Sequence, residues 1–525
     1  MKFTRRLSVI ALVFAFLLPA GAVPRKPKLV VTIVVDQFRY DYLTRFRSEF
    51  HGGIARLLDQ GAVFVDARYR QYPTVTAVGH STLLSGATPS VSGIISNEWF
   101  DRTADNGAGK AVTSVVDDST LRVGGGPGAV GASPRRLLVS TLGDELKMAN
   151  KNSKVIGISI KDRSAILPAG HAADAAYWFD ADSNHFVTST WYMQKLPDWV
   201  KQVNDDRPVY KYLGANWLPL NAKPGDRPFC TMTAGTEVRF CEAIENTPFG
   251  NDLVEEFAEK AIVSENLGGH EGTDLLAISF SSNDYVGHLF GPDSPEVHDI
   301  TIRTDQLLAK LLDFLNSRLG EGNTLVVFSA DHGVSPTPKA NNDRKMPGGY
   351  LDSADYSKKI AARLSEKFGT GDWFVYNAYG AFYLNRKTMT EKKLDPAEVR
   401  RVAGDFARTL PNIARAFTWD DLLSGQAASD FVGRAAQLGF YGPRSGDLIL
   451  LPEPYYMFFS GSGTTHATPY GYDTHVPLIF YGAGVPKGIH YEPVAINDVA
   501  PTLAAILEVE TPSGSSGRIL AEILK

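Results

Sequence analysis

Five short apolar runs, separated by amphipathic segments, dominate the hydrophobic pattern of the chain. They are rich in β-branched residues and cover residues 28–35, 154–160, 275–280, 324–330 and 476–481. Near-continuous apolar runs of this length are typical of strands buried on both faces, as in a parallel sheet. Helical patterns lie between them, over residues 136–149, 300–319 and 499–507. The alternation predicts an α/β fold, a three-layer αβα sandwich around a mostly parallel central sheet.

Two long stretches interrupt this alternation, at about 165–268 and about 334–471. The first is rich in Trp, Tyr, Asn and Pro, and the second contains a predicted strand over Trp373–Leu384 and a predicted polar helix over Asp395–Thr409. No internal repeat, flexible linker or domain boundary is visible. We therefore interpret both stretches as insertions that cap the site of a single catalytic domain, residues 23–525.

The N-terminal residues 1–22 have the pattern of a secretory signal peptide. Lys2, Arg5 and Arg6 precede the apolar run Leu7–Leu18, and small residues follow up to Ala22. A membrane anchor is the alternative, but the run is short for a span and no second apolar run follows. We expect an exported protein, periplasmic or secreted, without a stable membrane anchor after cleavage.

Charge and cysteine content exclude several classes of protein. The 525 residues carry 53 Lys and Arg against 58 Asp and Glu, a formal net charge of −5, so we infer no nucleic-acid-binding partner. Two cysteines are too few for a cysteine-built metal cluster. In an oxidising compartment Cys230 and Cys241 favour a local disulfide, and two free thiols are the alternative.

Metal-ligand side chains gather at the ends of the apolar runs. Asp36 and the pair Asp331-His332 directly follow runs, and His475 directly precedes one. Asp284 and His288 have the i, i+4 spacing that places both on one face of a helix. Each feature alone is more often a turn residue or a surface ion pair. Together, at one edge of a sheet, these O and N donors predict two divalent metals, with zinc the default although ligand type alone does not identify the metal.

Four further residues are suited to binding a phosphate group. Thr76 opens a predicted helix, where a hydroxyl faces free N–H groups and a nucleophile can attack an anion, although a helix cap is the alternative. Asn97 can donate to a phosphoryl oxygen or be a turn residue. Lys161 and Arg163 follow a strand and can bind one anion together, or form a solvated loop.

These residues stand in seven motifs, in order along most of the chain: VVDQFR, YPTVTAVGHSTLLSG, IISNEW, SIKDRSAILPAGH, SSNDYVGH, ADHG and YDTHVPL. In this order they resemble the alkaline phosphatase superfamily, in particular its phosphate-irrepressible, threonine-nucleophile alkaline phosphatases. The resemblance implies an alkaline phosphatase-like fold.

The resemblance also implies a role for each matched position. Thr76 would be the nucleophile and become phosphorylated, while Asn97, Lys161 and Arg163 would bind the phosphoryl oxygens. Two Zn²⁺ ions per chain would be held, one by Asp284, His288 and His475, the other by Asp36, Asp331, His332 and the Thr76 oxygen. His466 could compete for the metal role, but the family pattern favours His475 and leaves His466 beside the site. His80 is expected to pack or cap within its helix.

The expected activity is therefore hydrolysis of small-molecule phosphate monoesters, with broad specificity. A phosphodiesterase or nucleotide pyrophosphatase on the same scaffold is the alternative, but that branch resembles this one at the metals and lacks the Lys161–Arg163 pair. A sulfatase is disfavoured because Thr76-Ala-Val-Gly-His does not supply the C/S-x-P-x-R context. A metal-binding or phosphate-sensing protein without turnover would leave the nucleophile unexplained.

Overall fold

The computed structural model describes residues 26–232 and 243–524. The predicted signal peptide and Cys241 lie outside these ranges, so cleavage and the disulfide stay predictions. Within the described residues, eleven strands form the central sheet. In spatial order they are β22 (Gly488–His490), β2 (Ala62–Phe64), β21 (Leu478–Gly482), β14 (Thr324–Ser329), β1 (Leu29–Val35), β13 (Asp274–Phe280), β8 (Val155–Ser159), β9 (Ala175–Asp180), β10 (His185–Ser189), β6 (Val116–Val123) and β7 (Val130–Ala132).

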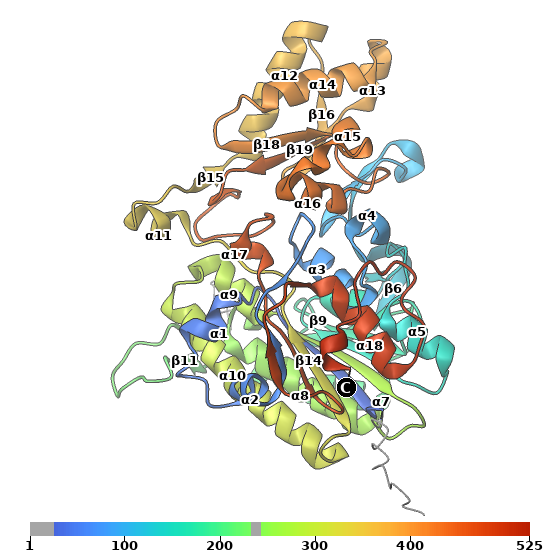
Figure 1. Cartoon of the computed structure of the whole chain (residues 1–525), viewed down its shortest axis with the longest axis vertical. Helices are drawn as coiled ribbons and strands as arrows, with labels where there is room; N and C mark the ends of the chain where they lie inside the picture. Colours follow the sequence, from blue (N-terminus) through green and yellow to red (C-terminus); the bar gives the residue numbers. More distant parts are fainter. Residues whose placement is uncertain (1–25, 233–242, 525) are drawn as a thin grey trace, which may run out of the picture.

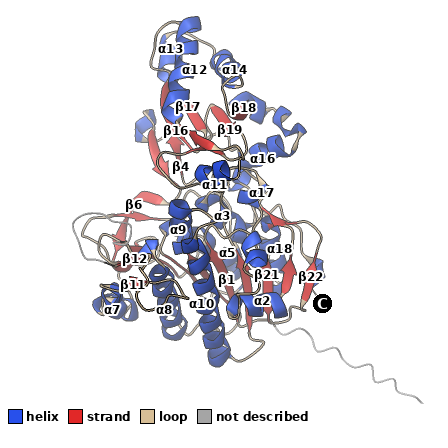
Figure 2. Cartoon of the chain, turned by 90° about the vertical axis from the view of Figure 1, so that its left-hand side faces the viewer, coloured by secondary structure: helices blue, strands red, loops and turns tan. Residues whose placement is uncertain are grey.

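The middle of the sheet, from β14 to β9, is parallel, as the apolar runs predict. Every residue of β1 is buried, because helices cover both faces of the sheet. One layer contains α2 (Gly53–Gln60), α8 (Pro248–Ser264) and α10 (Pro295–Leu319). The other contains α3 (Thr76–Ser85), α5 (Leu142–Ala149), α6 (Asp162–Ala169) and α18 (Val499–Leu507). The three-layer αβα sandwich is confirmed (Figures 1 and 2).

One of the five predicted strands differs in direction. β21 is antiparallel to β14, with Leu478 opposite Ser329, so β21 begins where β14 ends. The segment before β21, which contains His475, therefore still lies at the edge of the sheet where the parallel strands finish.

The first predicted insertion, at about 165–268, needs correction. Most of this stretch belongs to the main domain: β9 and β10 continue the central sheet and α8 packs on its face. The aromatic residues that suggested an irregular cap are core residues, since all of β9 is buried and its Tyr177 lies against Phe257 of α8. Aromatic side chains are as suited to strands as β-branched ones are.

The second insertion, at about 334–471, forms a lobe of its own at the top of Figure 1. Its sheet has the order β16 (Phe374–Ala378), β17 (Ala381–Leu384), β19 (Leu448–Pro452) and β18 (Ile413–Thr418), and α12 (Ser353–Phe368) and α14 (Pro396–Ala407) pack on it. The predicted strand Trp373–Leu384 is thus a hairpin, because Gly380 allows a tight turn with φ +79°. The lobe has a separate apolar core around Trp373.

Among the described residues, no helix has both the length and the apolar character needed to cross a membrane.

Candidate active site

The predicted ligand side chains converge where the parallel strands end. Asp36 follows β1, the pair Asp331-His332 follows β14, and Asp284 and His288 lie on α9 (Ser282–Phe290). The i, i+4 pair does share one helix face, with His288 Nε2 3.3 Å from Asp284 Oδ1. Asp36, Asp284 and Asp331 are at most 4% exposed, which places three carboxylates together in the interior.

Lys161 links two of these carboxylates. It is the residue before α6, and its Nζ donates to Asp36 Oδ2 at 2.9 Å and to Asp284 Oδ2 at 2.6 Å. Burial alone would lower the pKa of Lys161, but the two carboxylates raise it, so the side chain stays an ammonium. With two of its three N–H donors used, one remains for an anion at the site.

Three histidines present the same ring nitrogen to the carboxylates. Backbone carbonyls can only accept, so each Nδ1 that contacts one must carry the proton: His288 donates to Thr464, His332 to Gly333 and His466 to Thr74. Each Nε2 is then free to bind a cation, and it faces the cluster. A fixed Nδ1–H is the arrangement that orients histidine ligands of metals.

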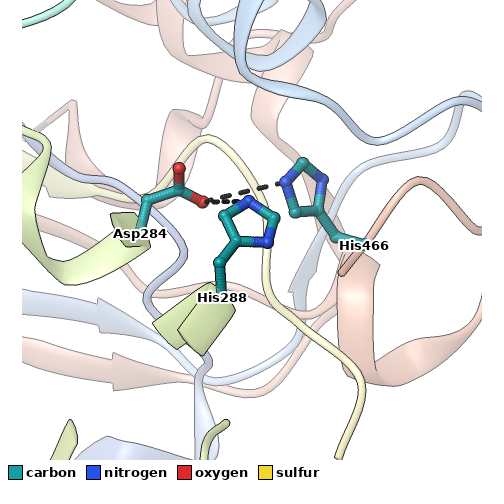
Figure 3. Close-up of side chains that lie close together, drawn as sticks. All are labelled: Asp284, His288 and His466. Carbon is teal, nitrogen blue, oxygen red and sulfur yellow. Dashed lines mark ion pairs between the residues drawn. The ribbon is translucent and has the colours of Figure 1, made fainter. Parts of the chain in front are cut away.

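His466, rather than His475, completes the group around Asp284. His466 Nε2 lies 3.7 Å from Asp284 Oδ1, and the rings of His466 and His288 are 5.0 Å apart (Figure 3). The prediction for His475 is therefore corrected. Its Nε2 donates to the carbonyl of Val65 at 2.9 Å and its ring stacks on Tyr40, whereas the donor atoms grouped with Asp284 are those of His288 and His466. The sequence offered TTHATP as a second candidate, but no periodicity in this loop distinguished the two histidines.

His80 lies deeper, between Asp36 and Asp331. Its Nδ1 donates to the carbonyl of Thr76, and its Nε2 is 3.0 Å from Ser279 Oγ. Ser279 in turn donates to Asp36 at 2.6 Å, so His80, Ser279 and Asp36 form a hydrogen-bonded chain. Both nitrogens of His80 thus contact groups that neighbour the candidate ligands, the carbonyl of Thr76 and the hydroxyl of Ser279. The expectation that His80 packs within its helix agrees with its complete burial.

Mutual contacts, rather than exposure, determine the charge states in this cluster. Burial would raise the pKa values of both Asp284 and Asp331. Lys161 and His288 outweigh burial at Asp284 and lower its pKa, and His332 does the same at Asp331. Burial would lower the pKa of His332, but Asp331 outweighs it and raises the value to about 9. Burial, with the neighbouring His332 and His288, holds the pKa of His466 well below its usual range. Asp284 and Asp331 are therefore ionised near neutral pH.

The cluster suits metal ions on its own geometry. There are two sets of three residues, and within each set the donor atoms lie within 4.8 Å of one another: Asp284–His288–His466 and Asp36–His80–Asp331. Asp331 Oδ2 is buried without a well-aligned hydrogen bond from a described residue, and His332 Nε2 lies 3.2 Å from it. Buried carboxylates are normally paired or coordinate a metal, and this carboxylate and imidazole are a donor pair that suits a cation. His332 Nε2, 3.2 Å from Asp331 Oδ2, is a further nitrogen donor beside the second set, whereas both nitrogens of His80 contact other groups.

Thr76 lies beside His332, close to the candidate metal ligands. It is the first residue of α3, 1% exposed, and its Oγ1 is 3.5 Å from His332 Nε2. The helix comes this close to the ligand loop because position 79 is glycine, where a Cβ would overlap the carbonyl oxygen of Asp331. The hydroxyl predicted from sequence as a nucleophile thus stands at a helix N-terminus, beside the candidate metal ligands.

Asn97 and Arg163 come from segments that pack against α3. The amide oxygen of Asn97 accepts from the N–H of Ala77 at 2.8 Å, which leaves the amide NH₂ to donate. Arg163 stands in the first turn of α6, and no described residue accepts a hydrogen bond from its Nε. Its nearest ion-pair contact is a long one, 3.7 Å to Asp162. Both side chains thus keep donors that an anion can accept.

Sequence reasoning missed two residues that the structure places here. Gln37 has the left-handed φ of 62°, and it donates through its backbone N–H to Asp331 and through Nε2 to Asp284. Tyr379, from the second insertion, accepts a hydrogen bond from Asn97. One indication for Gln37 was available in the sequence, its position directly after the candidate ligand Asp36. Nothing in the sequence indicated that Tyr379 would lie at the site.

Comparisons with known proteins agree with this geometry. The family model described as type I phosphodiesterase / nucleotide pyrophosphatase matches residues 30–476. Alkaline phosphatase PafA of Elizabethkingia meningoseptica is 35% identical over 529 residues, covering 96% of this chain and 95% of the relative. A protein of Myroides odoratus named calcium-transporting ATPase is 36% identical, covering 98% and 97%. A crystal structure of PafA superposes with a TM-score of 0.88 at 34% identity, covering 96% and 100%. The chain is therefore a member of the type I phosphodiesterase / nucleotide pyrophosphatase family, within the alkaline phosphatase superfamily.

Proposed function

We propose that this protein is an exported, zinc-dependent alkaline phosphatase that hydrolyses phosphate monoesters of broad specificity through a phosphothreonine intermediate. The observation that carries the proposal is the hydroxyl of Thr76 at a helix N-terminus, 3.5 Å from His332 Nε2, at a cluster of buried carboxylates and histidines that also holds the cation Lys161. Relatives named alkaline phosphatases, 35% identical over nearly the whole chain, support the same activity.

The metal ligands in this proposal are assigned from the geometry above. Asp284, His288 and His466 would hold one ion; Asp36, Asp331 and His332 would hold the other, together with Thr76 Oγ1. When bound, zinc ions supply Lewis acidity, which lowers the pKa of a bound hydroxyl or water and stabilises negative charge on attacking and leaving oxygens.

Residues of the chain supply the nucleophile and the groups that bind the phosphoryl oxygens. Thr76 Oγ1 attacks phosphorus, a Thr76–phosphorus bond forms, and the ester bond to the leaving alcohol breaks. Water next attacks the phosphothreonine, which releases inorganic phosphate and restores the hydroxyl. Asn97, Lys161 and Arg163 bind the non-bridging oxygens in both steps through their free donors. Such prearranged donors stabilise the charge that develops in the transition state.

Lys161 and Arg163 also favour monoesters over diesters. A phosphate monoester carries about two negative charges and a diester one, so two cations stabilise the monoester more. The family description includes phosphodiesterases, which makes diester hydrolysis the competing function.

A paired assay tests this proposal. We expect zinc-loaded protein to hydrolyse p-nitrophenyl phosphate much faster than bis-p-nitrophenyl phosphate, and a chelator to abolish both activities. Replacing Lys161 and Arg163 together with alanine should lower kcat/KM for the monoester by about 10²-fold or more and for the diester far less. A preference of the wild-type enzyme for the diester would contradict the proposed substrate, and equal losses in the double variant would make the pair structural.

The pH dependence of metal binding gives a second test. Because His332 has a pKa of about 9 in the metal-free protein, a metal ion must displace its proton. We expect the zinc affinity of chelator-treated protein to rise as pH increases from 6 to 9, with proton release on binding. Calorimetry in buffers of different ionisation enthalpy measures both quantities. An affinity that stays constant over this range would show that His332 is not a ligand.

A further inference from the structure

The tip of one hairpin in the second insertion reaches the catalytic cluster. β16 and β17 are antiparallel, and Tyr379 and Gly380 form the turn between them. Tyr379 has a φ of 50°, in the left-handed region that non-glycine residues rarely adopt. Unusual backbone conformations persist where the surroundings enforce them, and they gather at functional sites. The left-handed φ of Tyr379 therefore points to a functional role for this turn.

Contacts with the main domain hold this turn in place. The phenol of Tyr72 donates to the backbone carbonyl of Tyr379 at 3.3 Å. The Tyr379 side chain packs against Val75, Val78 and Ala467, which form a small apolar cluster. Val75 and Val78 flank the nucleophile Thr76, so Tyr379 is fixed directly against the N-terminal turn of α3.

The hydroxyl of Tyr379 meets the amide of Asn97. Because Asn97 Oδ1 accepts from the Ala77 N–H, its Nδ2 carries two hydrogens that must find acceptors. Tyr379 Oη, 3.3 Å away, accepts one of them. The other remains for a phosphoryl oxygen. The amide is thus anchored at both ends, by α3 through its oxygen and by the insertion through its nitrogen.

We propose that Tyr379 is a positioning residue that acts through Asn97, holding the amide NH₂ in the orientation that binds the phosphoryl group. This inference rests on the proposed function, in which Asn97 binds a non-bridging oxygen. It gives the second insertion a part in catalysis beyond covering the site, because the insertion supplies one of the two anchors of a phosphate-binding side chain.

Tyr379→Phe removes the acceptor and keeps the ring that packs on Val75 and Val78. We expect kcat/KM for p-nitrophenyl phosphate to fall about fivefold, the effect of one hydrogen bond. Inhibition by inorganic phosphate should weaken by a similar factor, whereas zinc content and thermal stability should stay at the wild-type level. Tyr376→Phe is the matched control. It also removes a tyrosine hydroxyl from this hairpin, but that hydroxyl interacts with Glu98 rather than with Asn97. This control should retain wild-type activity.

A double-mutant cycle identifies the route of the effect. Asn97→Ala should itself lower kcat/KM by about 10²-fold. Adding Tyr379→Phe to this variant should then change activity by less than twofold, because the side chain through which Tyr379 acts is gone. A full fivefold loss in the Asn97→Ala background would overturn the inference while leaving the proposed function intact. A silent Asn97→Ala variant would instead refute the assigned role of Asn97, and with it any role of Tyr379 through it.

Discussion

Thr76→Ala is expected to lower the rate of phosphomonoester hydrolysis by at least about 10³-fold, because it removes the proposed nucleophile, the hydroxyl beside His332. The substitution should leave the fold and the metal content largely intact. Thr76 Oγ1 has a single long contact, to His332, and alanine is favourable in a helix.

Thr76→Ser is the matched control, since it keeps a hydroxyl on Cβ and should retain substantial turnover. Acid quenching during turnover, followed by mass spectrometry of the peptide that contains Thr76, should detect the phosphorylated residue in the wild type but not in Thr76→Ala. Near wild-type turnover by zinc-loaded Thr76→Ala protein would contradict the nucleophile assignment.

His466→Ala is expected to have the second largest effect, with the loss of one zinc equivalent and a fall in turnover of about 10²-fold or more. The reason is geometric: His466 Nε2 faces Asp284, while its Nδ1 is fixed on the carbonyl of Thr74. Without this ring, Asp284 and His288 are left as an incomplete set.

His475→Ala provides a closely matched control. His475 also bonds a backbone carbonyl, that of Val65, and also stacks on an aromatic ring, that of Tyr40. Its removal therefore costs similar local contacts without removing a candidate ligand. We expect both zinc equivalents to remain and turnover to stay within about threefold of wild type. Two measurements decide between the two histidines: zinc analysis after gel filtration, and turnover with p-nitrophenyl phosphate. Loss of zinc and turnover in His475→Ala but not in His466→Ala would restore His475 as the ligand.

Local sequence patterns were sufficient for residues whose positions follow from regular structure. Asp36, Asp331 and His332 lie at the ends of β1 and β14 because a buried apolar run defines where a strand finishes. Asp284 and His288 share one face because helix periodicity places i and i+4 together. Such short-range rules operate within a few residues, so they can be applied before the fold is known.

Loops and long-range contacts could not be predicted in this way. His466 and His475 are nine residues apart in one connecting segment, and each has an aspartate or strand nearby in sequence. What distinguishes them is the backbone bridge between Arg68 and His475, which directs the His475 ring to Val65 and away from Asp284. The same limit applies to β9 and β10, whose place in the central sheet depends on partners rather than on their own pattern.

The amino-acid pattern was enough to predict the α/β sandwich, a candidate nucleophile at the start of a helix, and most of the O and N donors at the ends of strands. Three features required the packed structure: which histidine lies beside Asp284, the hydrogen bonds from Gln37 to two carboxylates, and the contact of Tyr379 with Asn97, 282 residues away along the chain. The physical reason is that hydrophobic periodicity encodes which face of an element is buried, whereas hydrogen bonds between distant loops depend on how those elements pack together.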